Sequence, residues 1–382
     1  MWTDASQLDY IDFGGTDLRR DYTWDDRGLL ESDVLTDDGL TVASNHYTYD
    51  LDGNVKIEEV YLPGNPQAGM HTYGYDDAGR LTSWQLSATT IEYEWDGAGN
   101  RITAGSDSFE YDDRNRLTNG PGGDYTYTAR GTLETVTDGG STVTYGFDPL
   151  GRMVDYNSEA VFSYDGLDRV ATRNQVPFSY IGAMLDPAGD GTFTYSRTPA
   201  GWLVSQTNDT TGEVSLVGLD RHGDLTWLAD PVTGQVTDTA MYDPYGNPTA
   251  STGGITPTVG FQGDYTDPAS GEVWMGARWY SGSDAVFRSR DTVFGELNTP
   301  VSLNRYTYAF ANPLSYWDPD GRWANVMDGA GGYIEGFEDD GTPIRTPISE
   351  TRQKRHDEVI SAMETRAKIR ELTGEANFET NQ

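Results

Sequence analysis

The sequence predicts a mainly β protein, in which repeated antiparallel β-hairpins form a spiralling sheet and a short helical tail follows at the C-terminus. The first observation is composition: 382 residues include 45 Gly, 24 Tyr, 10 Trp and 12 Phe, which favours strands and turns. The second is a short unit that recurs along the first 250 residues. The third is the C-terminal end, which loses this unit and carries apolar residues at helical spacing.

The recurring unit reads aromatic-x-aromatic-Asp-x-x-Gly-Arg/Asn-apolar. It appears as HYTYDLDGNVKI from His46 and as YGYDDAGRLTSW from Tyr73. The intervals between copies vary, so this is a structural repeat with loops of variable length. Its aspartate stands at Asp25, Asp50, Asp76, Asp96, Asp112, Asp148, Asp165 and Asp243.

Each unit predicts one β-hairpin. Side chains alternate along a strand, so the two aromatic rings of a unit lie on one face. The aspartate can accept hydrogen bonds from the amides of the turn, and glycine supplies a positive φ. A lone hairpin is barely stable in water. We therefore expect successive hairpins to pair laterally into one long sheet whose rings cover a shared face.

Three segments follow from the pattern. Residues 1–250 carry the hairpin units, residues 251–321 form a block entered through the loop ASTGGITPT from Ala250, and residues 322–382 form a tail of different composition. The glycine-rich stretch from Gly329 predicts a loop. A helix is expected at about 349–373, with Ser349 as its N-cap and Gly374 just beyond its end.

The repeats resemble the YD repeats of the RHS family, and the segment GFQGDYTDPASGEVWMGARWYSGSDAVFRSRD with NRYTYAFANPLSYWDPDGRW resembles its RHS repeat-associated core. This family includes bacterial polymorphic toxins, insecticidal toxin-complex C subunits and teneurin YD shells. The resemblance implies a β-shell around a hollow interior, a core block that plugs one end, and a variable C-terminal segment beyond it. About a dozen hairpins, by the strand-turn rule, predict a partial shell.

The resemblance also implies a site. Asp291 and Asp318 match the family's two aspartates, which act as an aspartyl autoprotease that cuts just after the core. Here the bond would be Arg322–Trp323, and Arg290 is the neighbour expected to orient Asp291. Two adjacent carboxyl groups share a proton, so one can activate water while the other acts as an acid. The structural alternatives are a turn role for Asp318 and an ion pair of Asp291 with Arg290 or Arg288.

The sequence departs from the family motifs at both aspartates. Thr292 follows Asp291 where proline is usual, and Arg322 stands where leucine is common. The regular aromatics offer a further alternative, because Tyr47, Tyr73 and Tyr125 could form a platform for stacking carbohydrate. Rings at alternate strand positions are more often cross-strand packing, which is the interpretation we favour.

Charge and composition exclude several classes of function. There are 61 acidic and 26 basic side chains, a formal net charge of −35, which argues against nucleic acid bound by the shell. The sequence contains no run of 18 apolar residues, so it predicts no membrane-spanning helix, and no signal peptide is visible. The absence of cysteine, the scattered histidines and the lack of a phosphate loop predict no metal and no cofactor.

The resemblance implies placement outside the cell, secreted or at the cell surface. The partners it implies are the chain's own C-terminal segment, an immunity protein, secretion machinery or cell-surface glycans. Three functions stay open at this point: a structural shell that encloses or presents the tail as part of a toxin system, an autoprotease that releases the tail, and an adhesion or carbohydrate-binding protein.

Overall fold

The computed structural model describes residues 7–198, 202–254, 258–295, 300–322, 324–327, 332–337 and 343–347. It confirms a mainly β fold: strands follow one another in chain order and pair antiparallel with their sequence neighbours. The hairpin ladder is interrupted twice, at the buried Phe109 and across residues 178–192, so the repeats form three sheets of ten, nine and six strands instead of one.

The first sheet contains β1 (Tyr10–Asp12), β2 (Leu18–Trp24), β3 (Leu30–Asp37), β4 (Leu40–Tyr49), β5 (Val55–Tyr61), β6 (Gly69–Tyr75), β7 (Leu81–Leu86), β8 (Thr89–Trp95), β9 (Arg101–Ala104) and β10 (Asp107–Ser108). The second contains β11 (Glu110–Tyr111), β12 (Leu117–Gly120), β13 (Gly123–Tyr127), β14 (Leu133–Asp138), β15 (Ser141–Phe147), β16 (Met153–Tyr156), β17 (Ala160–Tyr164), β18 (Val170–Arg173) and β19 (Val176–Pro177). The third contains β20 (Phe193–Arg197), β21 (Leu203–Asn208), β22 (Val214–Leu219), β23 (Leu225–Ala229), β24 (Val236–Tyr242) and β25 (Pro248–Thr252).

The aspartate of each unit organises the turn, as the sequence predicts. One oxygen of Asp76 accepts the backbone N–H groups of Ala78 (3.0 Å) and Arg80 (2.9 Å). Its other oxygen pairs with the Arg80 guanidinium at 2.7 Å. Gly79 supplies the left-handed residue, with φ of 75°. The same pattern of a carboxylate and a partner four residues later recurs at Asp50, Asp96, Asp112, Asp148, Asp165 and Asp243.

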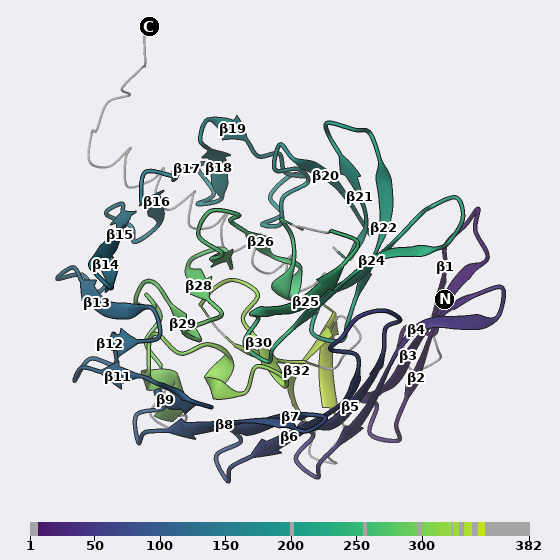
Figure 1. The fold of residues 1–382 in the computed structure, drawn as a ribbon, viewed down its shortest axis with the longest axis horizontal. Coiled ribbons are helices and arrows are strands. Elements are labelled where there is room, and N and C mark those ends of the chain that lie inside the picture. Colours follow the sequence, from purple (N-terminus) through teal and green to yellow (C-terminus); the bar gives the residue numbers. More distant parts are fainter. Residues whose placement is uncertain are drawn as a thin grey trace, which may run out of the picture.

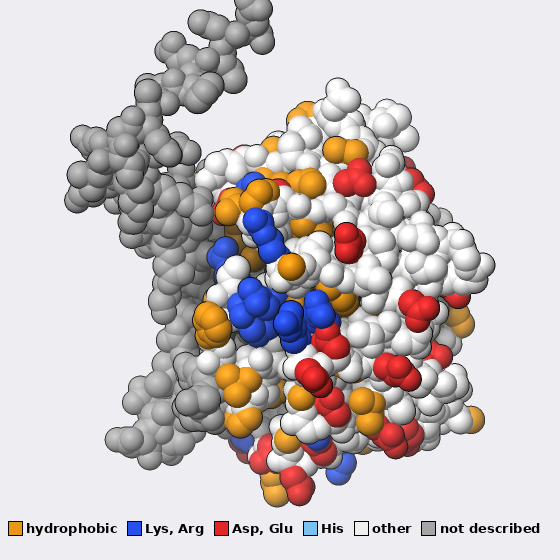
Figure 2. Space-filling view, turned by 90° about the vertical axis from the view of Figure 1, so that its left-hand side faces the viewer, with side chains coloured by type: hydrophobic (Ala, Val, Ile, Leu, Met, Phe, Trp, Pro, Cys, Tyr) orange, Lys and Arg blue, Asp and Glu red, His pale blue; other side chains and the backbone are white. Residues whose placement is uncertain are grey.

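The same side chains join one hairpin to the next. Arg80 donates to the carbonyl of Asp96 in the following turn at 3.0 Å and lies over the Trp95 ring. The Trp95 indole donates back to the carbonyl of Leu81 at 2.8 Å. On the face shown in Figure 2, Lys and Arg gather in one patch, while acidic side chains are scattered over the rest of that face.

The hairpins curve around an inner block, visible in green at the centre of Figure 1. This block contains β26 (Tyr265–Thr266), β27 (Val273–Trp274), β28 (Trp279–Ser281) and β29 (Val286–Phe287), with short 3₁₀ turns at Phe261–Gly263, Pro300–Leu303 and Ala309–Ala311. In several units the first ring is buried and packs against this block. Phe162 packs on Trp279 with centroids 4.7 Å apart, and the Tyr125 hydroxyl donates to Asp284 at 2.8 Å. These rings are buried, which favours packing over a carbohydrate platform.

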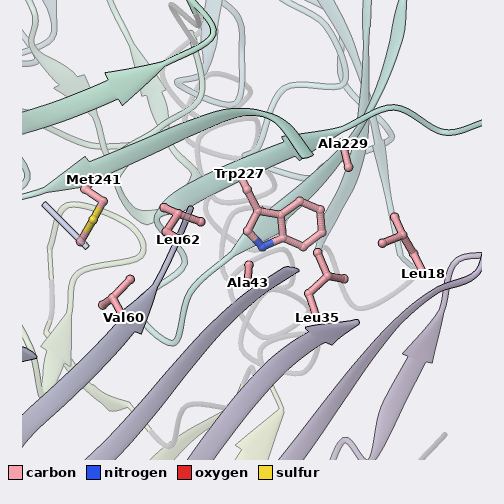
Figure 3. Close-up of a cluster of buried hydrophobic side chains, with 8 residues drawn as sticks. All are labelled: Leu18, Leu35, Ala43, Val60, Leu62, Trp227, Ala229 and Met241. Atoms are coloured by element: carbon pink, nitrogen blue, oxygen red, sulfur yellow. The ribbon is translucent and has the colours of Figure 1, made fainter. Parts of the chain in front are cut away.

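The third sheet folds back onto the first and closes the ring of hairpins. Trp227 and Met241 meet Leu18, Leu35 and neighbouring apolar side chains of the first hairpins in one buried cluster (Figure 3). The guanidinium of Arg20 pairs with Asp33 and also donates to the carbonyl of Leu219. We call this contact between the two ends of the hairpin array the seam.

Beyond the inner block, β30 (Tyr316–Trp317) pairs with β31 (Asn325–Met327), which pairs with β32 (Gly332–Phe337), which pairs with β33 (Pro343–Pro347). The glycine-rich stretch from Gly329, for which we expected a loop, therefore includes a strand, because its backbone pairs with β31 and extends a ladder that starts in the inner block. The helix expected at 349–373 lies outside the described residues. The proposed boundary at residue 321 stays a prediction.

Candidate functional site

The two aspartates singled out by the sequence come together at the end of the inner block. Asp291 follows β29, and its backbone N–H donates to the carbonyl of Arg305 at 3.0 Å. Asp318 comes directly after β30. Both side chains are buried, with 7% and 2% of their surface exposed.

One arginine lies between the two carboxylates. A single terminal nitrogen of Arg278 is 2.9 Å from Asp291 Oδ2 and 3.1 Å from Asp318 Oδ2. The guanidinium carbon lies 3.5 Å from the centre of the Phe287 ring, which covers its face. Arg278 is itself 5% exposed, so the three charges form a buried triad with a net charge of −1 when both acids are ionised.

The backbone where the chain leaves the inner block is part of the same arrangement. Arg278 Nε donates to the carbonyl oxygen of Gly321. The N–H of Arg322 donates to Asp318 Oδ1 at 2.9 Å and to Asp320 Oδ1 at 3.0 Å. The Gly321–Arg322 peptide is therefore held on both sides. Gly321 has φ of 67°, and a Cβ there would lie 2.5 Å from the carbonyl oxygen of Met275.

The buried environment raises the pKa values of both carboxyl groups. Burial raises the pKa of Asp318 to about 7; Arg278 opposes this rise, while Asp320 and Asp291 add to it. Burial also raises the pKa of Asp291, again opposed by Arg278. A carboxyl group with a pKa near 7 can hold or release a proton at neutral pH, which suits acid–base chemistry.

A cavity of about 30 Å³ adjoins the pair. Arg278, Asp291 and Asp318 line it together with Asn304, Arg305 and Arg322. A polar cavity needs roughly 10–15 Å³ to hold one water molecule. The site therefore brings together two carboxyl groups, a cation, a stretch of backbone and room for a water molecule.

The sequence identified the acids but not their cation. Arg290 is exposed, and the ion pair of Asp291 is made with Arg278 instead, because Arg278, directly before β28, is buried beside both acids. Arg288, the other expected partner, pairs with Glu272 and Asp284 at 2.7 and 2.6 Å. Nothing in the GARWY segment signals the position of Arg278. Trp323 lies outside the described residues.

A second cavity, of about 70 Å³, lies at the seam. Its charged lining includes Asp33, Glu58, Asp220, His222 and Asp224. Asp33 pairs with Arg20, and the His222 ring is 2.9 Å from Asp224. The polar lining and the volume suit a small cluster of water molecules.

Within the residues that the structure describes, no group of three or more His, Asp or Glu side chains is arranged to hold a metal ion. The same described residues include no helix that is both long and apolar enough to cross a membrane.

The fold and site define a class of protein, an antiparallel hairpin shell closed around an aromatic inner block. The chain belongs to the teneurin YD-shell family, whose model matches residues 11–314. This confirms the YD-repeat resemblance on which the shell was predicted.

Similar sequences include a tRNA3(Ser)-specific nuclease WapA of Bacillus spizizenii, 26% identical over 279 residues, and a tRNA nuclease WapA of Bacillus subtilis, 26% identical over 276 residues. Each match covers 64% of this chain, and the chain spans 11% of the length of each relative. Similar solved structures include a TcdB2-TccC3-Cdc42 crystal structure (TM-score 0.62, 16% identity, 84% of this chain and 19% of that one). A Photorhabdus luminescens Tc holotoxin pore with a TccC3 mutation has a TM-score of 0.64 at 15% identity, covering 91% and 19%. These structures establish the fold.

Proposed function

We propose that this chain is a shell segment of a secreted or cell-surface toxin system, which encloses or presents its own C-terminal segment. The support is the closed ring of hairpins around an inner block, together with relatives whose names denote toxins and nucleases. An immunity protein, secretion machinery and surface glycans stay predictions from the family resemblance.

Autoproteolysis is the second function, and one observation favours it. The chain leaves the inner block at Arg322, whose own N–H is bonded to Asp318. An aspartyl protease needs two carboxyl groups beside the peptide bond that it cuts. In this chain the bond that follows the held Gly321–Arg322 peptide is Arg322–Trp323.

The reaction is hydrolysis. Ionised Asp291 accepts a proton from a water molecule, and the oxygen of that water attacks the carbonyl carbon of Arg322. Protonated Asp318, whose pKa burial raises to about 7, supplies a proton, so that the C–N bond breaks to leave a carboxyl group on Arg322 and an amine on Trp323. Water is consumed, and no cofactor enters the step.

The test is the intact mass of the purified protein under denaturing conditions. Wild type is expected as two fragments that meet between Arg322 and Trp323, and Asp318→Asn as a single chain. Asp148→Asn is the matched control, because Asp148 also precedes a proline and caps a turn, but it lies in a hairpin. Wild type that stays whole would overturn the autoprotease and leave the pair structural.

A further inference from the structure

We propose that Arg278 is the positioning residue of this site: it fixes both carboxylates and the backbone beside the cut bond, and it sets the pH range of the cleavage. This inference rests on the proposed autoproteolysis. Arg278 acts through Asp291 and Asp318, and neither the repeat pattern nor the motif at Asp318 indicates it.

The contacts of Arg278 use every edge of its guanidinium. One terminal nitrogen bridges Asp291 and Asp318, Nε donates to the carbonyl of Gly321, and the other terminal nitrogen donates to the carbonyl of Arg305 at 3.1 Å. The Phe287 ring fixes the plane of the group. A planar fork with five N–H donors meets this set of acceptors, whereas the point charge of lysine cannot.

The contact with Gly321 links the acids to the substrate. The Gly321 carbonyl belongs to the peptide just before Arg322, so Arg278 holds the acids and the chain to be cut on one rigid group. A displacement of about 1 Å between reacting groups can slow a reaction by about a hundredfold. Losing this contact should therefore reduce the rate even where both acids remain.

The other charges facing the pair do not replace Arg278. Asp320 raises the pKa of both acids, since its charge has the same sign. Arg305 lowers the pKa of Asp291 from a more distant position, and its side chain is engaged by the backbone carbonyl of Asp291. Arg290 and Arg322 are exposed to solvent, where charge is screened. Arg278 is the buried cation that touches both acids.

The sign of the pH effect follows. Cleavage needs Asp291 ionised and Asp318 protonated, so the rate should fall as pH rises through the pKa of Asp318. A cation favours the ionised form, and its removal raises the pKa of a neighbouring carboxyl by about one unit or more. Without Arg278, the alkaline limb of the rate profile should move to higher pH by at least about one unit.

The experiment follows the cleavage of freshly synthesised full chain, diluted from cell-free translation into buffers from acidic to alkaline pH, with the fraction cut read by mass. Four chains are compared: wild type, Arg278→Met, Arg278→Lys and Arg288→Met. Arg288 is the matched control because it is equally buried and also bridges two carboxylates in the same block.

Arg278→Met should be slower than wild type, with its alkaline limb displaced upward. Arg278→Lys should keep the limb of wild type but cut about tenfold more slowly or worse, because it keeps the charge and loses the fork. Arg288→Met should keep the alkaline limb of the wild-type pH–rate profile, even if the substitution lowers the stability of the protein.

The inference is overturned if Arg278→Met retains the wild-type limb, or if Arg278→Lys cuts at the wild-type rate, while Asp318→Asn stays whole. In that case the proposed autoprotease survives without it. Wild type that is never cut overturns both. If circular dichroism shows that Arg278→Met does not fold, the cleavage rate of Arg278→Lys and the alkaline limb of its pH–rate profile still test the inference.

Discussion

The seam that closes the hairpin ring depends on one glycine. Gly218 in β22 pairs across the ladder with Trp227 in β23, and the indole ring folds over it. A Cβ built on Gly218 would lie 1.8 Å from Trp227 Cε2. We predict that Gly218→Ala destabilises the protein by displacing this ring from the seam.

The magnitude follows from the contact. Carbon atoms pack best at about 3.5–4.0 Å, so the ring must move by roughly 2 Å. It has little room to do so, because Trp227 is 3% exposed and packed against Leu35 and Ala43. Overpacking of this kind typically costs about 1–3 kcal/mol, and we expect the upper half of that range.

The assay is the free energy of unfolding from urea denaturation. Gly166→Ala is the control, since a Cβ at Gly166 meets nothing within 4 Å; it should be neutral or slightly stabilising. The cost of Gly218→Ala should also vanish in a Trp227→Ala background, where the ring is gone. Equal stability of Gly218→Ala and Gly166→Ala would refute the steric argument.

Two further predictions concern the inner block. Burial raises the pKa of Glu272 from 4.5 to about 7, although Arg288 opposes this rise. Between these pH values the native state binds more protons than the unfolded state. The free energy of unfolding should therefore fall as pH rises from about 4.5 to 7, by about 3 kcal/mol at most. In Glu272→Gln the urea midpoint should no longer change with pH across that window. If the midpoint of this variant depends on pH as in wild type, Glu272 is not the source of the pH dependence. Gly321→Ala would place a Cβ 2.5 Å from the Met275 carbonyl oxygen at a residue with a φ of 67°. By moving the held peptide, this variant should slow cleavage about a hundredfold, as measured by intact mass. Cleavage of Gly321→Ala at the wild-type rate would show that this peptide need not be held.

The hairpins could be predicted because their chemistry is local. Asp76 and Arg80 are four residues apart, and the turn between them needs no partner from elsewhere in the chain. The interruptions of the ladder were not predictable in this way. They depend on how the curving sheet meets the inner block, as at Phe109, whose burial is a property of the whole shell.

The site was predictable only in part, for the same reason. Asp291 and Asp318 stand in motifs that can be recognised in the sequence. Arg278 is 40 residues before Asp318, and its role depends on the tertiary packing that buries it beside both acids. A sequence pattern favours the adjacent Arg290 as the partner of Asp291, but neighbouring residues on an extended chain point in opposite directions, and Arg290 is exposed.

The position of the site also separates cutting from release. Three contacts that hold the inner block within the hairpins precede Arg322: the Tyr306 hydroxyl with the Gly131 carbonyl, the Trp279 indole with Tyr164, and Asn312 with Asn54. Hydrolysis after Arg322 would leave them intact. The pairing of β30 with β31 joins Trp317 to Asn325 across the cut bond, so a cut tail would stay paired to the shell through its strand. Release would then require that pairing to open, which is why a denaturing mass measurement, and not co-purification, reports the chemistry.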